Sequence, residues 1–461
     1  MAVKARWHRE LPLLARAPKG SRPRWLIERS TGTMLDVTLI RENPEYVQNA
    51  LAKRAVHVDI DDFLRLDQDL RQARGEVEQL RGDRKTISRK IAQQRAGETV
   101  ENLHVEARTV AERLAAAETH LDELERACRS FLDPLPNLPD DDVPAGGKES
   151  NEVVRTVGRL PEFGFVPKDH VELAQTLGLV DYQRGAKLGG SGFWIYRGNG
   201  ALLEWALLNY FVEAHLRDGY EFLLPPHILT YAAGYTAGQF PKFAEEVFAL
   251  EQGEHGPERF LLPTAETALV NVHRDETLPA AELPKRYFAY TPCYRKEAGG
   301  YRTAERGTLR GHQFNKVELF QFTRPEESET AHEELLGKAE QLVADLGLHY
   351  RITRLAAGDT SAAMAKTFDV EVWLPSTRAY VEVSSVSNAR DYQARRGNIR
   401  YRPRQGKSAF VHTLNASGLA TSRLLPALLE QHQQEDGTVV VPKVLRKWVM
   451  RQVLSQSMEA Q

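Results

Sequence analysis

The chain has 461 residues, of which 42% are hydrophobic and 27% charged, a composition typical of a globular protein with two or more domains. Its formal net charge of −2 excludes binding of nucleic acid through a general basic field, so a polyanionic partner would have to be held by local patches. With two cysteines, Cys128 and Cys293, the chain cannot form a disulfide framework or a zinc cluster of several thiolates. So few cysteines suit a reducing compartment, and we expect a cytoplasmic protein. No apolar run approaches the length of a membrane span, so no membrane association is expected.

The first 33 residues form a basic segment without a hydrophobic period. They hold eight lysines and arginines against two glutamates, and they lack the continuous apolar core of a secretory signal. We interpret them as a disordered extension, with an organellar transit peptide as the alternative. Met34 would serve as a start.

Residues 62–132 have the pattern of an antiparallel two-helix coiled coil. Apolar residues recur at three- and four-residue steps from Phe63 to Ile91, broken only at Arg84, and again from Leu103 to Phe131, with a polar break at residues 94–99. Because the break is short, the second helix must fold back along the first. The first helix carries a cluster of cations: Arg74, Arg81, Arg84, Lys85, Arg89 and Lys90. They either pair with neighbouring glutamates on a solvated face or contact an RNA backbone, and a protein partner is a third reading.

Prolines and acids in residues 134–147 end the second helix and mark a linker. We therefore expect an arm domain at residues 34–140 and a larger domain at residues 141–461. The larger domain mixes helical and extended signals. Residues 201–217 and 326–346 have helical patterns, and residues 220–226 read as a strand ended by proline.

Residues 287–322 read as two strands joined by a loop rich in glycine and arginine. Side chains alternate across a strand, so Arg295 and Glu297 are expected on one face of the first strand. Phe314, Glu318 and Phe320 are expected on one face of the second. A guanidinium matches phosphate oxygens two at a time, and an aromatic face stacks a base. The pattern favours a nucleotide site, and a surface hairpin with ordinary ion pairs is the alternative.

Three further segments carry polar groups. Thr264 and Glu266 suit an ammonium ligand or a helix cap. In the paired strands expected at residues 368–374 and 379–385, Glu382 and Ser385 suit Mg²⁺, unless this is a solvated strand end. Residues 393–404 are basic and form either an RNA-facing loop or an exposed one.

Residues 415–423 follow a strand and are expected to form a turn that leads into a helix. Small residues let a ligand approach the backbone, and a helix start favours anions. Arg423 would supply a second guanidinium there.

The order of these elements resembles a class II aminoacyl-tRNA synthetase, with its three motifs near residues 203–226, 287–322 and 410–429. Within that class the chain resembles the seryl-tRNA synthetases of the bacterial type, over about residues 34–448. The phrases that carry the resemblance are PTAE (263–266), TPCYRKEAG (291–299), HQFNKVE (312–318), FDVEVWLP (368–375) and NASGLA (415–420). It implies an α+β fold, an antiparallel sheet flanked by helices, with the coiled-coil arm at its N-terminal side.

The resemblance also implies ATP-dependent activation of L-serine and its esterification to the 3′ end of serine tRNA. Arg295 and Arg423 would be the catalytic cations, and Mg²⁺ would sit on Glu382 and Ser385, with no zinc expected. The serine site would comprise Thr264, Ala265, Glu266, Glu318, Asn415 and Ser417. The ATP site would comprise Arg295, Lys296, Glu297, Phe314, Glu382, Val383, Ser384, Ser385 and Arg423.

The family implies partners as well. Its arm grips the long variable arm of serine tRNA across a homodimer, and the family also charges selenocysteine tRNA where one exists. Two rival functions are a ligase that charges a carrier protein, which the heptads disfavour, and a non-catalytic tRNA-binding homologue, which the retained polar set disfavours. A zinc-dependent seryl enzyme conflicts with the two cysteines.

Four residues depart from the family pattern. Ala416 and Ser422 stand where glycine is usual, and Thr421 replaces a valine. Pro426 lies inside the helix that follows, which costs about 3 kcal/mol if uncompensated. We interpret these as marks of a divergent or duplicated copy, in which added side-chain atoms crowd ATP or force φ angles that suit glycine.

Overall fold

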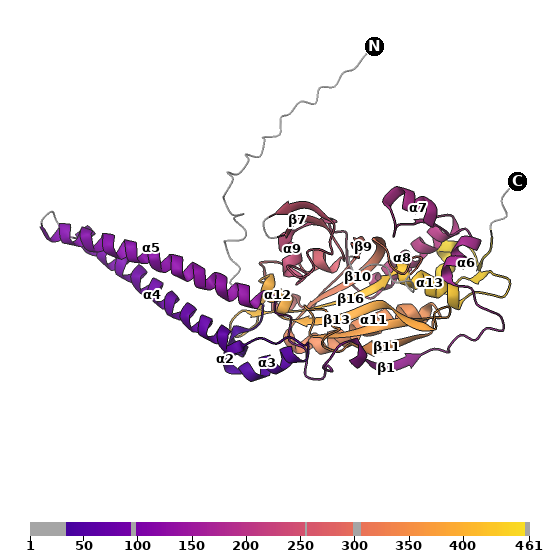
Figure 1. The fold of residues 1–461 in the computed structure, drawn as a ribbon, viewed down its shortest axis with the longest axis horizontal. Coiled ribbons are helices and arrows are strands. Elements are labelled where there is room, and N and C mark those ends of the chain that lie inside the picture. The colour runs from indigo at the N-terminus through magenta and orange to yellow at the C-terminus, as the bar shows by residue number, and fades with distance from the viewer. Residues whose placement is uncertain (1–33, 94–97, 254–255, 298–305, 457–461) are drawn as a thin grey trace, which may run out of the picture. The chain divides into compact units, whose positions relative to one another are not determined.

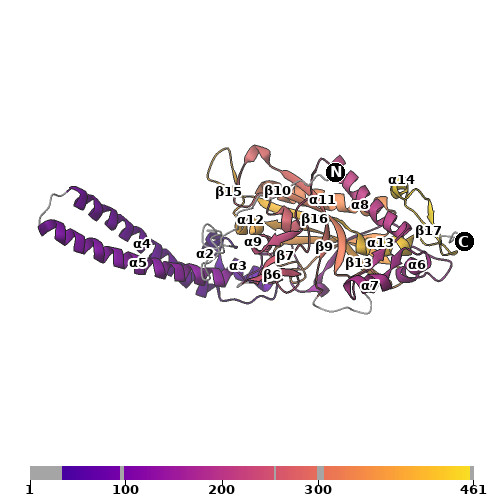
Figure 2. The ribbon, with the colours of Figure 1, turned by 90° about the horizontal axis from the view of Figure 1, so that it is seen from above.

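The computed structural model describes residues 34–93, 98–253, 256–297 and 306–456, so the expected basic extension lies outside the described residues. The N-terminal part is helical, and two long helices run antiparallel along each other (Figures 1 and 2). The short helices α2 (Val37–Glu42) and α3 (Pro44–Ala52) come first, and the two long helices are α4 (Ile60–Gln93) and α5 (Glu98–Leu132). In the described part, no helix is both long enough and apolar enough to cross a bilayer.

The heptad residues of α4 and α5 form the seam between the two helices. Val77, Leu80 and Ile87 of α4 pack against Val110 and Leu114 of α5. At the base of the hairpin the ring centroids of Phe63 and Phe131 lie 5.5 Å apart. Since each apolar stripe covers the other, the coiled coil expected from the sequence is confirmed.

The arm cations fall into two groups. Arg74 pairs with Glu125 at 2.9 Å and Arg81 with Glu118 at 2.7 Å, so both cations bridge the two helices. The second group is exposed and makes no ion pair with another described side chain: Arg84, Lys85, Arg89 and Lys90. The solvated-face reading therefore fits the first group, and the second remains open to a polyanion.

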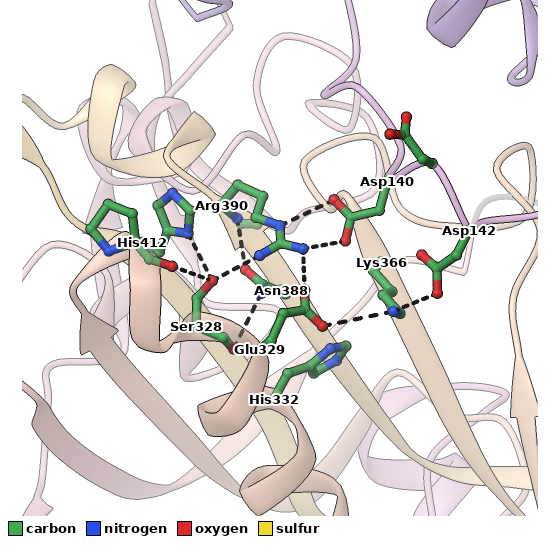
Figure 3. A network of polar contacts seen from close by, with 12 residues as sticks. Asp140, Asp142, Ser328, Glu329, His332, Lys366, Asn388, Arg390 and His412 are labelled. Carbon is green, nitrogen blue, oxygen red and sulfur yellow. Dashed lines mark hydrogen bonds and ion pairs between the residues drawn. The ribbon is translucent and has the colours of Figure 1, made fainter.

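The linker after α5 is fastened to the larger domain by charged and polar contacts (Figure 3). Arg390 reaches both carboxylate oxygens of Asp140, at 3.1 and 2.5 Å, and also contacts Glu329. Lys366 Nζ lies 2.7 Å from Asp142 Oδ2. The acids expected to mark a linker therefore also anchor it.

Within the described residues, eight strands form the central sheet, in which β4 pairs parallel to β9 and the other neighbours pair antiparallel. In spatial order the strands are β1 (Glu152–Val157), β11 (Tyr350–Arg354), β12 (Lys366–Leu374), β13 (Ala379–Arg390), β16 (His412–Ala420), β10 (Gln313–Thr323), β9 (Lys285–Tyr294) and β4 (Glu221–Leu223).

The two faces of the sheet have different covers because side chains alternate along each strand. Val317 and Leu319 of β10 enter the main core, together with side chains from three helices: α8 (Asn199–Arg217), α11 (Ser328–Asp345) and α13 (Thr421–Gln431). Phe320 and Phe322 of the same strand belong to a second core with α10 (Glu266–Leu269) and α12 (Tyr392–Arg396). Phe314, Lys316 and Glu318 alternate with the core residues and so share the face of Phe320.

The remaining elements are short. One three-stranded sheet joins β5 (Ile228–Thr230), β7 (Gly256–Leu261) and β6 (Ala249–Gly253). Another joins β15 (Ala409–Phe410), β14 (Arg400–Arg402) and β8 (Thr277–Pro279). Two-stranded sheets join β2 (Val180–Asp181) to β3 (Ile195–Tyr196), and β17 (Val439–Val440) to β18 (Val453–Leu454). The other helices are α6 (His170–Thr176), α7 (Tyr182–Gly189), α9 (Tyr231–Thr236), α14 (Arg446–Val449), η1 (Lys148–Ser150), η2 (Ala280–Glu282), η4 (Pro325–Glu327) and η5 (Lys443–Leu445).

Three expectations about local structure were wrong. The first strand of the hairpin ends at Tyr294, before Arg295 and Glu297, so strand alternation does not place these two side chains on one face. Glu297 also has a positive φ of 50°. Residues 415–420 continue β16 up to α13 without the expected turn. Residues 393–404 are no exposed basic loop, because Arg396 is buried with its guanidinium over the ring of Tyr235. In each case long-range packing outweighs the local signal.

Candidate active site

The hairpin of β9 and β10 positions Arg295 beside Phe314. Just past the end of β9, Arg295 N donates to the His312 carbonyl at 3.0 Å, which continues the ladder by one bond. Its Nε donates to the Pro263 carbonyl at 3.2 Å, and its guanidinium lies 5.3 Å from the centroid of the Phe314 ring. A cation and an aromatic face expected to act on one nucleotide are therefore neighbours.

Arg423 enters from the first turn of α13. Its Nη1 lies 3.0 Å from Glu382 Oε2 and 3.2 Å from the Glu382 carbonyl oxygen on β13. Partial burial would raise the pKa of the Glu382 carboxyl, but the Arg423 and Arg295 guanidiniums outweigh it and hold the pKa below its usual range. Both guanidiniums therefore act on one carboxylate, although 128 positions separate them in the chain (423 − 295).

The polar residues expected to bind serine meet between β10, β16 and α10. Asn415 Nδ2 lies 3.0 Å from Glu318 Oε1 and 3.4 Å from Glu266 Oε2. Ser417 is the Cα partner of Glu318 across the ladder, so both side chains project from the same face. Thr264 lies before α10, and its Oγ1 accepts from the backbone N–H of Glu266 at 3.3 Å. These contacts form a compact cluster of buried and half-buried polar side chains, the polar cluster.

Lys316 belongs to this polar cluster, and the sequence reasoning missed it. Its Nζ donates to Thr264 Oγ1 at 2.6 Å and lies 2.5 Å from Glu318 Oε2, and its side chain is 7% exposed. Lys316 precedes Glu318 by two residues, so strand alternation placed both on one face and was the available signal. Gln393 was also missed: its Nε2 donates to Glu266 Oε1 at 2.8 Å.

We expect Lys316→Met to lower the free energy of unfolding by about 3 kcal/mol or more, because it leaves the buried Glu318 carboxylate without its cation. Urea denaturation measures the loss. The double variant Lys316→Met/Glu318→Gln should recover most of it, since no buried charge is then left unpaired. Equal stability of Lys316→Met and the unchanged protein would show that the pair is not coupled.

Glu266 should make stability depend on pH. Burial raises the pKa of its carboxyl from 4.5 to about 7, helped by the neighbouring Glu318. Between these values the native state binds more protons than the unfolded state, so the free energy of unfolding falls as pH rises, by about 3 kcal/mol in all. Glu266→Gln should remove this part of the loss between pH 5 and pH 8, measured by urea denaturation. Burial also raises the pKa of Glu204 to about 7, so a residual slope should persist in the variant. An unchanged slope would refute the assignment.

Several expected site residues do not offer free side chains. Val383 lies in the main core, and Ser384 Oγ donates to the Ser417 carbonyl at 2.6 Å, so these two residues have only their backbone for ATP. Ala265 is buried and stands at the N-cap of α10. Glu297 lies 2.5 Å from Arg310 Nε.

Asp369 is a further carboxylate that the sequence reasoning missed. It pairs across the ladder with Ser385, and its Oδ1 is buried without a hydrogen-bond partner. Burial and the nearby Glu382 raise the pKa of the Asp369 carboxyl well above its usual range, against a hydrogen bond from Ser385. Its place on β12, opposite the polar end of β13, needed the strand register. The described residues contain no cluster of three or more histidine, cysteine or acidic side chains suited to a metal ion.

The departures from the family pattern cause none of the expected backbone strain. Ala416, Thr421 and Ser422 all lack a positive φ. Ala416 is buried in the sheet between Leu319 and Val386. Thr421 Oγ1 donates to Glu204 Oε1 at 2.6 Å, so its hydroxyl serves a buried carboxylate of α8.

Two family models match the chain. Residues 34–139 match the seryl-tRNA synthetase N-terminal domain, and residues 248–432 match the class II tRNA synthetase core domain for Gly, His, Pro, Ser and Thr. A serine–tRNA ligase 2 of Clostridium acetobutylicum is 57% identical over 420 residues, which cover 90% of this chain and 99% of that protein. The chain belongs to the seryl-tRNA synthetase family. A serine–tRNA ligase of Thermodesulfovibrio yellowstonii is 44% identical over 422 residues, 90% of this chain and 99% of the relative.

Solved structures of seryl-tRNA synthetases have the same fold. The enzyme of Pyrococcus horikoshii, solved with ATP, superposes with a TM-score of 0.85 at 35% identity, over 92% of this chain and 99% of that one. The cytoplasmic enzyme of Naegleria fowleri, solved with AMP, gives a TM-score of 0.81 at 28% identity, over the same shares. The fold class and the enzyme class expected from the sequence, a class II serine–tRNA ligase, are thereby confirmed.

Proposed function

We propose that this chain activates L-serine with ATP and then esterifies the seryl group to the 3′ end of serine tRNA. The observation that carries the proposal is that Arg423 pairs with Glu382 at 3.0 Å, while Arg295, beside Phe314, lies near enough to Glu382 and to Glu266 of the polar cluster to lower the pKa of both carboxyls against the effect of burial. Cations that can bind phosphates therefore lie beside a polar cluster whose groups can hydrogen-bond a small hydroxylated amino acid.

In the first step a carboxylate oxygen of serine attacks the α-phosphorus of ATP, and pyrophosphate leaves with the electron pair of the broken bond. Arg295 pairs with the serine carboxylate and the α-phosphate, and Arg423 with the far phosphates. Phe314 stacks the adenine, and Glu297 and Lys296 border that end of the site. Because both cations are held by backbone carbonyls or a carboxylate before substrate binds, they stabilise the developing charge without reorganisation.

In the second step a ribose hydroxyl at the 3′ end of tRNA attacks the seryl carbonyl carbon, the ester forms, and AMP leaves. This chain's residues contribute position and charge throughout, and no covalent enzyme intermediate is needed. The family's use of ATP and tRNA supports both steps.

Serine selection follows from the buried acceptors. Glu318 would take the ammonium and the hydroxyl of serine, with Ser417 also toward that hydroxyl, while Thr264 and Glu266 would line the amino-acid site. Asn415 Nδ2 bridges the carboxylates of Glu266 and Glu318, because it lies within hydrogen-bond distance of both. Alanine has no hydroxyl to offer Glu318 or Ser417 in this buried site, so it should be strongly rejected.

Mg²⁺ fits beside the phosphates. Glu382 stays ionised, Ser385 offers a hydroxyl, and Asp369 Oδ1 is a buried oxygen without a partner. Mg²⁺ takes one or two protein oxygens plus phosphate and water, so Glu382 and Ser385 would hold it, where it would neutralise phosphate charge. No zinc is proposed.

The partners we propose are serine tRNA, gripped along its long variable arm by the coiled coil, and a second copy of the chain. Apolar residues of α8 and the β4 region support a dimer because they are exposed: Leu202, Trp205, Leu216, Phe222 and Leu224. A polyanion would meet the exposed cations of α4. The buried free thiols Cys128 and Cys293 suit a cytoplasmic location.

Exchange of radioactive pyrophosphate into ATP tests the activation step. We expect exchange with serine and at least about 10³-fold less with alanine, glycine or threonine. Aminoacylation of bulk tRNA then tests the transfer step. Exchange without charging would favour a carrier-protein ligase, and neither activity would favour a non-catalytic homologue.

A further inference from the structure

Pro426 removes a backbone donor from the middle of α13. In a regular helix the N–H of residue 426 would bond the carbonyl of residue 422, and proline has no N–H to give. Pro426 and Ser422 are both buried, so water is a poor substitute. The Ser422 carbonyl therefore needs a donor from elsewhere.

That donor is Thr308. Its Oγ1 donates to the Ser422 carbonyl at 2.9 Å across 114 positions of sequence, and its side chain is 1% exposed. Thr308 lies on the segment 306–310, which leads from the hairpin loop back into β10. Pro426 thus leaves the Ser422 carbonyl without its helical donor, and Thr308 supplies a hydroxyl donor in its place.

The segment 306–310 meets α13 at further points. Next to Thr308, the Leu309 carbonyl accepts from Arg423 Nε at 3.4 Å. Towards the other end of α13, His170 lies between Arg306 and the helix: its Nε2 is 3.1 Å from the Arg306 carbonyl, and its Nδ1 is 2.8 Å from Glu430. Gly307 has a φ of 75°, and a Cβ there would come within 2.6 Å of His170 Nε2. The segment is therefore fitted against α13.

We propose that Thr308 is a positioning residue for Arg423, and that Pro426 makes this possible by leaving the Ser422 carbonyl open. The bond fixes the first turn of α13 to the segment that also holds the Arg423 side chain through Leu309. Arg423 is thereby held ready for the far phosphates of ATP, so the inference rests on the proposed function. Pro426 interrupts the hydrogen bonding of α13, and the carbonyl that it leaves open is the point at which the segment 306–310 attaches to the helix.

The test is a cycle of Thr308→Val and Pro426→Ala, with Thr308→Ser as the variant that keeps the hydroxyl. Valine keeps the shape of threonine but leaves the carbonyl without a donor, whereas alanine at 426 returns the helix N–H. We expect Thr308→Val to raise the KM for ATP in serine-dependent exchange about tenfold and to lower kcat, with the KM for serine changed less than about twofold. Thr308→Ser should restore the KM for ATP. In the Pro426→Ala background the effect of Thr308→Val should shrink to about twofold or less.

Urea denaturation and calorimetric titration with ATP give readouts that do not need turnover. The inference is overturned if Thr308→Val binds ATP like the unchanged protein, if its effect is equal in both backgrounds, or if only the urea midpoint moves. Failure of Thr308→Val to fold in both backgrounds would also overturn it, whereas rescue of folding by Pro426→Ala would support the pairing. If the unchanged protein shows no serine-dependent exchange, the proposed function fails, while the cycle in stability and ATP binding still reports on the pair.

Discussion

Arg295→Ala should reduce serine-dependent pyrophosphate exchange by at least about 10³-fold, because it removes the guanidinium expected at the point where negative charge builds up. Arg295 is held on three sides, by the His312 and Pro263 carbonyls and by the Phe314 ring. A cation held in place before substrate arrives loses little entropy on binding, so its removal should affect kcat as well as the two KM values.

Two further variants separate charge from geometry. Arg295→Lys keeps the positive charge but loses the planar fork, and we expect it to recover a small part of the activity. Arg259→Ala removes an arginine that is exposed on β7 and pairs with Glu251, so exchange should stay unchanged. Exchange by Arg295→Ala close to that of the Arg259→Ala control would contradict the assignment of the site.

Removing the four exposed cations of the arm should strongly weaken tRNA charging while leaving amino-acid activation intact. The variant changes Arg84, Lys85, Arg89 and Lys90 to glutamine, and it spares the Arg74–Glu125 and Arg81–Glu118 pairs that join the two helices. We expect the KM for tRNA to rise about 100-fold, and the dependence of binding on salt to become shallower, because phosphate contacts are lost. Pyrophosphate exchange should remain within about twofold of the unchanged enzyme.

A matched control keeps the coiled coil and changes cations that serve its structure. Arg74→Gln/Arg81→Gln removes the two bridging pairs and should lower the helix melting temperature more than it weakens tRNA binding. Loss of exchange in the variant without the four exposed cations would show that the arm serves the catalytic domain directly. Unchanged tRNA binding by the variant that lacks the four exposed cations would show that these cations take no part in tRNA recognition.

The arm was predictable in detail because its structure depends on near neighbours. Apart from the break at Arg84, positions 63–91 and 103–131 carry an apolar residue at each three- or four-residue step, and such a stripe is most stable when another apolar stripe covers it. Leu80 and Leu114 both lie in the seam as the heptads require. The strand alternation that placed Phe314 and Glu318 on one face is an equally local rule, and it held.

The main residues of the polar cluster were predictable from the sequence, but the contacts among them were not. Glu266, Glu318 and Asn415 were expected at the serine site from the resemblance, and the structure brings them within hydrogen-bond reach through Asn415. Lys316 and Gln393 were missed, although both touch the same carboxylates. Their partners come from separate strands and helices, and a single sequence does not show which faces will meet.

The sequence by itself determined the coiled coil, the antiparallel hairpin and the types of charged group available for ATP, because these follow from periodicity and from the chemistry of side chains. The tertiary structure alone decided that residues 415–420 continue a strand, that Glu266 shares its surroundings with Glu318, and that Thr308 supplies the donor missing at Pro426. The physical reason is that strand register and burial depend on contacts between residues a hundred or more positions apart. Those contacts set which polar groups lose water and which find partners.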